Sequence, residues 1–307
     1  MKIVIVGAGA MGSVFGACLA ESGCETVLLD VRADVVQAIE ASGITVRRDG
    51  SERRVPVRAT ADVASVGQVD AAIILVKSFH TRAAAESIRP IVDFSTIVAT
   101  LQNGIGNAQI LAEVYDPRQI VQGVTAESGT SLGPGVVDHP GNAATYLGPV
   151  AGDSLAASER LAQVLRAAGF DAQATPAIET EIWKKLIVGA STLPAPALLG
   201  MACGPLMRQP HMHQLVNETA REVVAVAQAL GHAIDAEERI AYIHELLMAV
   251  EDAKGSMVQD IAAGRRTEID MINGGIVSAA EAYGVPVPIN RTLVALVKGW
   301  ESLRGLG

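Results

Sequence analysis

The chain has 307 residues, of which 50% are hydrophobic, and its formal net charge is −9. This length and apolar content suffice for two domains with sizeable cores. The acidic balance, the lack of a Lys/Arg run and an aromatic content of 3% argue against a nucleic-acid partner. No apolar run has transmembrane length, no signal peptide precedes the first strand, and neither the three cysteines nor the six histidines have metal-ligand spacing. We therefore expect a cytoplasmic protein with no membrane partner and no metal.

A glycine-rich turn follows the first predicted strand. Ile3–Val6 is a β-branched apolar run that is typical of a buried strand, and it leads into Gly7-Ala8-Gly9-Ala10-Met11-Gly12 and then a helical pattern. In G-x-G-x-x-G the first glycine permits the sharp turn, the second lets a pyrophosphate approach the backbone, and the third lets the helix pack on the strand. The segment therefore predicts dinucleotide binding by Gly7, Gly9, Ala10, Met11 and Gly12; glycines kept for tight packing alone are the alternative.

The second predicted strand, 26–29, ends at an acidic residue. Asp30 lies eighteen residues after Gly12, where a carboxylate accepts hydrogen bonds from the adenosine ribose and repels a 2′-phosphate. Arg32 is a candidate for the opposite role, because an arginine there can grip that phosphate. We expect NAD as the cofactor, with NADP as the alternative.

Residues 1–175 read as alternating strands and helices. A helix is expected at 34–41, a hairpin at 44–57 around Asp49-Gly50, strands at 71–76, 97–101, 119–124, 143–147 and 170–174, and a helix at 155–168. This alternation predicts a doubly wound, largely parallel α/β sheet. Gly7–Gly12, Asp30, Lys77 and Asn103 all follow strand ends, where ligands bind in such sheets.

Residues 176–307 show helical periodicity throughout. Helices are expected at 178–190, 215–230, 240–254 and 293–303, and a stripe formed by Ile269, Ile272, Ile276 and Ala280 indicates another. We therefore divide the chain into a dinucleotide-binding domain (1–175) and a helical substrate domain (176–307), with the site expected between them.

Polar residues interrupt the helical half in three places. They are Glu181-Ile182-Trp183-Lys184-Lys185-Leu186, Ser256-Met257-Val258-Gln259-Asp260, and Thr267-Glu268-Ile269-Asp270. Two consecutive lysines cannot share one helix face, so one is expected to point inward. Hydride transfer to a ketone requires a proton donor beside the new oxyanion, and a lysine oriented by a carboxylate can serve. Solvated helix faces are the alternative for such residues.

The chain resembles the ketopantoate reductase (2-dehydropantoate 2-reductase) family over nearly its whole length. The resemblance rests on GAGAMG (7–12), LVKSF (75–79), QNGIG (102–106), PGVVDHPG (134–141), EIWKKL (181–186), SMVQD (256–260) and TEIDMINGG (267–275). It implies a Rossmann domain, a helical domain similar to that of 6-phosphogluconate dehydrogenases, and reduction of a 2-oxo acid by a nicotinamide cofactor. Separately, the apolar surface that the helical half presents leads us to expect a homodimer.

The resemblance implies roles for individual residues. Lys185 matches the general acid, Glu268 the carboxylate that works with it, and Ser256 a contact to the substrate carboxylate. Asn103 and Lys77 match residues near the nicotinamide and substrate. His139 lies in a matching loop, and we interpret it as structural.

Three positions depart from the family pattern. Val31 replaces an arginine that usually holds the NADP phosphate, and Gly189 and Leu193 replace two asparagines that help bind ketopantoate. A pocket without those amides cannot select for a hydroxyl group, so we expect a different 2-oxo or 2-hydroxy acid, bulkier or more apolar. The first alternative is an authentic NADPH-dependent reductase of pantothenate biosynthesis, with Ser191 or Thr192 replacing the amides. The second is a non-catalytic dinucleotide sensor.

Overall fold

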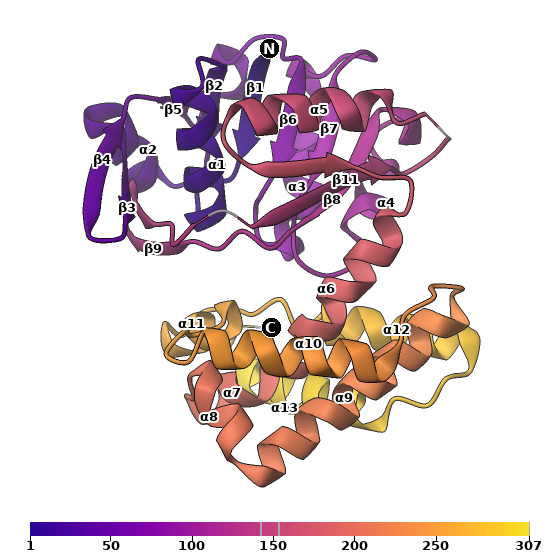
Figure 1. Ribbon diagram of the computed structural model, residues 1–307. Coiled ribbons are helices and arrows are strands. Elements are labelled where there is room, and N and C mark those ends of the chain that lie inside the picture. The colour runs from indigo at the N-terminus through magenta and orange to yellow at the C-terminus, as the bar shows by residue number, and fades with distance from the viewer. Residues whose placement is uncertain (142, 153, 307) are drawn as a thin grey trace. The chain divides into compact units, whose positions relative to one another are not determined.

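The computed structural model describes residues 1–141, 143–152 and 154–306. The chain forms two compact units. The sheet unit comprises Met1–Gln102 and Asn107–Ile178, and the helical unit comprises Asn103–Gly106 and Glu179–Gly307. Figure 1 shows the elements of each unit.

An eight-stranded sheet forms the centre of the sheet unit, in the order β12-β11-β8-β7-β6-β1-β2-β5. Every neighbouring pair is parallel except β8 with β11. The strands are β1 (Lys2–Val6), β2 (Glu25–Leu29), β5 (Arg58–Thr60), β6 (Ala71–Ile74), β7 (Ile97–Thr100), β8 (Ile120–Thr125), β11 (Ala144–Pro149) and β12 (Asp171–Ala174). The chain passes from β1 to β2 on one side and later to β6 on the other, so the strand order reverses beside β1.

Side chains alternate between the two faces of this sheet, as strand geometry requires. Ile3 and Ile5 pack with Phe15 in one core, whereas Val4 and Val6 pack with Ile88 in another. The first core is covered by α1 (Ala10–Glu21), α2 (Ala33–Ser42) and α5 (Ala156–Ala167), and the second by α3 (Thr81–Ser87) and α4 (Asn107–Ala112). The expected doubly wound arrangement is therefore confirmed (Figure 1). Short 3-10 turns cover Val63–Ser65, Ser78–His80, Arg89–Ile91 and Pro117–Gln119.

The predicted hairpin belongs to a separate sheet of order β4-β3-β10-β9. Strands β3 (Ile44–Arg48) and β4 (Ser51–Val55) are antiparallel, and Asp49 and Gly50 both have positive φ, as a type I′ turn requires. Strands β9 (Thr130–Gly133) and β10 (Val136–Asp138) complete the sheet, since β10 pairs in parallel with β3. The hairpin is confirmed, whereas its pairing with β9 and β10 was not expected from the sequence.

The helical unit contains eight helices among its described residues, largely packed around α9. They are α6 (Ile178–Thr192), α7 (Pro194–Leu199), α8 (Cys203–Arg208), α9 (Pro210–Ala229), α10 (Ala236–Ala249), α11 (Ser256–Ala262), α12 (Asn273–Tyr283) and α13 (Pro288–Ser302). Their core includes Trp183, Val223, Ile243 and Ile276, each no more than 6% exposed. The all-helical second half is confirmed.

The apolar stripe at 269–280 is only partly helical. Ile276 and Ala280 lie on α12, but Ile269 and Ile272 precede its first residue, Asn273. Both isoleucines are buried, because the segment before α12 folds back through bonds from the Met271 and Ile272 N–H groups to the Glu268 carbonyl. The apolar spacing therefore reports burial across this segment rather than a continuous helix.

The division between the compact units follows contacts rather than chain order. Ile178, the first residue of α6, belongs to the sheet unit, where it lies against Gly148. Asn103–Gly106 belongs to the helical unit: the Ile105 N–H donates to the Met271 carbonyl at 2.9 Å, and Gly104 has φ +81° where a Cβ would lie 2.2 Å from that oxygen. A glycine at 104 permits this close approach. Assignment of a function to each half stays a prediction.

Candidate functional site

The glycine turn has the geometry that its spacing predicts. Gly7 has φ +102°, and its N–H donates to the Leu29 carbonyl at 2.8 Å. A Cβ on Gly12 would lie 1.8 Å from the Gly7 carbonyl oxygen, so α1 can lie this close to the turn only with glycine at that position. A Cβ on Gly9 would have nothing within 4 Å, which leaves open space before the N-terminus of α1. That open cradle fits a phosphate group.

Asp30 is tied to the same turn. Its Oδ2 accepts the Ala8 N–H at 2.6 Å, and its Oδ1 accepts the Arg32 N–H at 2.9 Å. The Arg32 guanidinium pairs instead with Asp34 at 2.6 Å, and both side chains are exposed. Val31 between them is 93% exposed, so an apolar side chain occupies the position where the family pattern has arginine.

Lys77 follows the next strand. It precedes the 3-10 turn Ser78–His80 and is half-buried. Strands β1, β2 and β6 are parallel neighbours, so Gly7, Asp30 and Lys77 lie at one edge of the sheet, beside the reversal of strand order. The predicted convergence of these three segments is therefore present. Asn103, the fourth, lies three residues past the end of β7 and belongs to the helical unit.

The two adjacent lysines of α6 have different surroundings, as expected. The Lys184 Nζ bonds to Glu181 at 2.9 Å, one turn earlier on the same helix, and its side chain is 40% exposed. The Lys185 Nζ instead donates to the Asn103 Oδ1 at 2.8 Å. Burial lowers the pKa of Lys185 to about 8, although the negative charge of Glu268 acts to raise it. An ammonium with this pKa can exchange a proton near neutral pH.

Glu268 lies in the bend between α11 and α12. Its side chain is buried, with the residue 7% exposed, and Thr267 and Ile269 on either side are fully buried. The Met271 carbonyl of the same bend accepts the Ile105 N–H, so the segment with Glu268 and the segment with Asn103 are hydrogen-bonded to each other. Lys185, Asn103 and Glu268, predicted from three distant stretches, thus form one polar cluster in the helical unit.

Leu193 follows the last residue of α6 and is the N-cap residue of α7. A Cβ on Gly189 would lie 3.6 Å from the Leu193 Cδ1, and a Cβ on Gly255 would lie 2.5 Å from its Cδ2. Gly255 is the N-cap residue of α11 and immediately precedes Ser256, which is exposed. Leu193 therefore presents an apolar side chain to the start of the helix on which Ser256 lies.

The two hydroxyls considered as replacements for the lost amides are directed elsewhere. The Ser191 Oγ donates to the Ile187 carbonyl at 2.7 Å, and the Thr192 Oγ1 donates to the Val188 carbonyl at 2.7 Å. Both residues are buried, at 3% and 8% exposure. These back-bonds to the preceding turn use the hydroxyl protons, so neither residue reproduces the side-chain amide of an asparagine.

The structure also describes the surroundings of His139 and of the three cysteines. His139 is 2% exposed, and its Nε2 lies 2.8 Å from the Glu127 Oε2. Cys18, Cys24 and Cys203 are free thiols. Among residues 1–141, 143–152 and 154–306, no group of three or more His, Cys, Asp or Glu side chains could hold a metal ion. No helix in the described part of the chain combines the length and hydropathy needed to span a membrane.

Comparison with known proteins identifies the family. The family model described as "Ketopantoate reductase PanE/ApbA" matches residues 3–152. The model described as "Ketopantoate reductase PanE/ApbA C terminal" matches residues 177–301. The chain belongs to the ketopantoate reductase family. It is accordingly a nicotinamide-dependent oxidoreductase of 2-oxo and 2-hydroxy acids, as the sequence resemblance implied.

Two curated members of the ketopantoate reductase family are similar along their whole length. The 2-dehydropantoate 2-reductase of Archaeoglobus fulgidus is 31% identical over 301 residues, covering 98% of each chain. That of Pyrococcus abyssi is 33% identical over 305 residues, covering 99% of each.

Solved structures extend the similarity to a second activity. A ternary structure of D-mandelate dehydrogenase with NADH and anilino(oxo)acetate has a TM-score of 0.93 at 30% identity, covering 99% of this chain and 100% of that one. A ketopantoate reductase family protein from Ralstonia eutropha JMP134 has a TM-score of 0.90 at 32% identity, with the same coverage. The fold is thus shared by proteins named for two different 2-oxo/2-hydroxy acid pairs.

The residues that hold the Glu268 bend, above all Glu301 and Lys298 on α13, were not predicted from the sequence. A signal was present, because Leu293, Val297 and Glu301 follow at intervals of four residues and share one helix face. Leu293 and Val297 are buried, and so is Glu301, at 0% exposure. An acid in register with an apolar stripe marks a buried carboxylate that requires partners.

Proposed function

We propose that this chain is an NAD-linked oxidoreductase that interconverts a 2-oxo acid with an apolar side chain and its 2-hydroxy acid. The observation that supports this most directly is the Lys185 ammonium, bonded to Asn103, with a pKa of about 8. A general acid is most effective when its pKa is near the working pH.

Lys185 is proposed to donate a proton to the substrate oxygen during reduction and to accept it during oxidation. The nearby Glu268 carboxylate raises the Lys185 pKa against the effect of burial, which keeps a larger share of the amine protonated. The Asn103 Oδ1 accepts a hydrogen bond from Nζ and so fixes its direction. Ser256, at the exposed start of α11, is proposed to bind the substrate carboxylate. A non-catalytic sensor would have no use for an ammonium whose pKa is lowered in this way.

The cofactor is proposed to bind across the glycine turn, with its pyrophosphate over Gly9 and the first residues of α1, Ala10 and Met11. A nicotinamide dinucleotide bound there supplies the hydride. Asp30 supports NAD over NADP, because its carboxylate is directed at the turn and would repel a 2′-phosphate. Arg32 is paired with Asp34, and Val31 offers no charge, so neither favours that phosphate.

The substrate side chain is proposed to lie near Leu193 and Gly189. Glycine at 189 leaves space, and leucine at 193 makes the neighbouring surface apolar. Such a surface accepts a bulky or aromatic group and gives no hydrogen bond to a hydroxyl. The similar D-mandelate dehydrogenase structure, which contains anilino(oxo)acetate, supports an aromatic 2-oxo acid.

The second candidate is NADPH-dependent reduction of 2-dehydropantoate, favoured by the names of the curated relatives. Steady-state kinetics with NADH and NADPH against 2-dehydropantoate, a branched aliphatic 2-oxo acid and phenylglyoxylate separates the two. We expect kcat/KM with NADH and phenylglyoxylate or the branched acid to exceed that with NADPH and 2-dehydropantoate by at least about tenfold. A preference for NADPH and 2-dehydropantoate would reject the leading proposal in favour of the second.

A further inference from the structure

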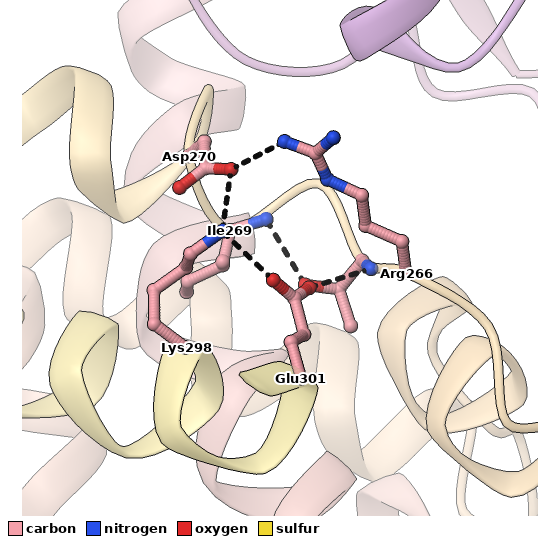
Figure 2. Close-up of polar contacts among 6 residues, drawn as sticks. Arg266, Ile269, Asp270, Lys298 and Glu301 are labelled. Carbon is pink, nitrogen blue, oxygen red and sulfur yellow. Dashed lines mark hydrogen bonds and ion pairs between the residues drawn. The ribbon is translucent and has the colours of Figure 1, made fainter. Parts of the chain in front are cut away.

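Two residues of α13 hold the bend on which Glu268 lies. Glu301, in the last turn of α13, is 0% exposed, and its Oε1 accepts both the Thr267 N–H at 2.8 Å and the Thr267 hydroxyl at 2.7 Å. The Thr267 Oγ1 in turn accepts the Ile269 N–H at 3.2 Å. The residues before and after Glu268 are thus both linked to one buried carboxylate, Thr267 directly and Ile269 through the Thr267 hydroxyl. Figure 2 shows Ile269 and Glu301 in this bend.

Lys298 links this carboxylate to Asp270 of the same bend. The Lys298 Nζ lies 2.9 Å from the Glu301 Oε2 and also donates to the Asp270 Oδ2 at 3.0 Å. Arg266 donates to the same Asp270 oxygen at 3.1 Å. Residues 298 and 301 are one turn apart, so their side chains lie on one side of α13. Figure 2 shows these contacts. Partial burial acts to lower the Lys298 pKa, but bonds to Glu301 and Asp270 outweigh it, so that pKa is raised.

Helix stability does not explain Glu301. A negative charge in the last turn of a helix interacts unfavourably with the helix dipole, and a buried carboxylate carries a desolvation cost unless it is paired and hydrogen-bonded. The Glu301 Oε1 is used to hold the bend through Thr267, whereas Oε2 lies beside Lys298, one turn earlier on α13. The arrangement is therefore one in which the end of α13 fixes the backbone at 267–269.

We infer that Glu301 is a positioning residue for catalysis: through Thr267 and Ile269 it fixes Glu268 where its charge acts on Lys185. The inference rests on the proposed function for its catalytic meaning. The physical consequence is specific. If the bend loses its bonds to Glu301, the Glu268 charge no longer raises the pKa of Lys185. Lys185 then loses its proton at a lower pH than in the intact bend.

The test compares Glu301→Leu, Glu301→Gln and Thr267→Val with wild type. Leucine removes every bond to the bend, glutamine keeps an acceptor for Thr267, and valine removes only the hydroxyl that links Glu301 to Ile269. We expect Glu301→Leu to lower kcat/KM for reduction about 10- to 100-fold, and Thr267→Val to lower it less. The alkaline limb of the pH profile should move to lower pH, NADH affinity should be unchanged, and Glu301→Gln should restore most of the activity.

Leu293→Ala is the matched control, because Leu293 is buried on the same face of α13 but forms no part of the hydrogen-bonded bend. It should lower Tm without moving the alkaline limb. If Glu301→Leu and Thr267→Val lower only Tm and leave kcat/KM and the pH profile as in wild type, the inference is overturned. Should Glu301→Leu fail to fold, Thr267→Val decides the matter by the same two readouts.

A second readout does not require turnover. Reductive ¹³C-methylation of the lysines, with Lys185→Arg to assign the signal, reports the Lys185 titration by NMR. We expect its pKa to fall in Thr267→Val and in Glu301→Leu. An unchanged Lys185 pKa would reject the positioning role, even if wild type reduced no 2-oxo acid. The absence of wild-type turnover would instead reject only the proposed function.

Discussion

Adjacent lysines on α6 acquire different chemistry from their surroundings. Lys184 bonds to Glu181 near the surface, where an ion pair contributes little to stability. Lys185 loses solvent and gains Asn103 as an acceptor, and its pKa falls from 10.5 to about 8. Because the charged form is the one that burial disfavours, the same side chain becomes a usable proton donor one position along the helix.

Replacing Lys185 should therefore remove turnover. We expect Lys185→Ala to lower kcat for reduction by about 10²- to 10⁴-fold, the usual contribution of a positioned acid, with NADH affinity kept within about twofold. Lys184→Ala is the matched control and should stay close to wild type. Equal losses in both variants would show that the helix rather than the buried amine had been disturbed.

The pH dependence of wild type follows from the same group. Reduction needs protonated Lys185, so its rate should fall as pH rises through about 8, whereas oxidation of the 2-hydroxy acid needs the neutral amine and should rise over that range. Rate profiles in the two directions should be measured at saturating cofactor. Parallel profiles would contradict the assignment of Lys185.

Gly9 and Gly12 differ in what a methyl group would meet. At Gly9 an added Cβ has open space and φ is −71°, so Gly9→Ala should fold with nearly unchanged Tm but weaken NADH binding about tenfold or more, since the methyl group enters the proposed phosphate cradle. At Gly12 the Cβ would strike the Gly7 carbonyl, so Gly12→Ala should lower Tm by several degrees. Thermal unfolding with an NADH titration checks both. Normal NADH affinity in Gly9→Ala would place the pyrophosphate elsewhere.

At the scale of elements, the end of α6 and the start of α11 meet through Leu193. Its Cδ1 and Cδ2 lie near Gly189 and Gly255, and Ser256 follows directly. An apolar side chain at this junction favours an apolar substrate group, whereas an amide would favour a hydroxyl.

Leu193→Asn should therefore change substrate preference. We expect the ratio of kcat/KM for 2-dehydropantoate to that for phenylglyoxylate to rise by about tenfold or more, because an amide can pair with the substrate hydroxyl. Leu199→Asn, on the exposed end of α7, is the control and should leave the ratio unchanged. An unaltered ratio in Leu193→Asn would remove Leu193 from the substrate surface.

At the scale of the whole molecule, the sheet unit and the helical unit have separate cores. The proposed cofactor residues lie in the first, and the proposed proton donor lies in the second. A ligand that binds one folded unit stabilises that unit by mass action, whether or not the other unit is folded.

NADH at about 100 times its Kd should add about 2.7 kcal/mol to the stability of the sheet unit. For a unit of this size the corresponding rise in its Tm is roughly 5 to 10 °C. Calorimetry with NADH and NADPH at equal concentration measures this, and we expect the smaller shift with NADPH. A larger shift with NADPH would contradict the role given to Asp30.

Local patterns in the sequence determined most of the fold. Periodicity placed the strands of the main sheet except β5, and it placed the long helices. The G-x-G-x-x-G spacing placed the glycine turn, because contacts between residues close in the sequence require glycine there. The residues of the polar cluster were also identified, because the family motifs name Lys185, Glu268 and Asn103 directly.

Tertiary structure decided what depends on contacts between distant residues. The hydrogen bond from Lys185 to Asn103 joins residues 82 positions apart and distinguishes Lys185 from Lys184. The hydrogen bond from Thr267 to Glu301 joins residues 34 positions apart. The assignment of Asn103–Gly106 to the helical unit depends likewise on the approach of Gly104 to Met271. Hydrogen bonds across such separations form only when the chain has folded, so no local pattern could specify these partners.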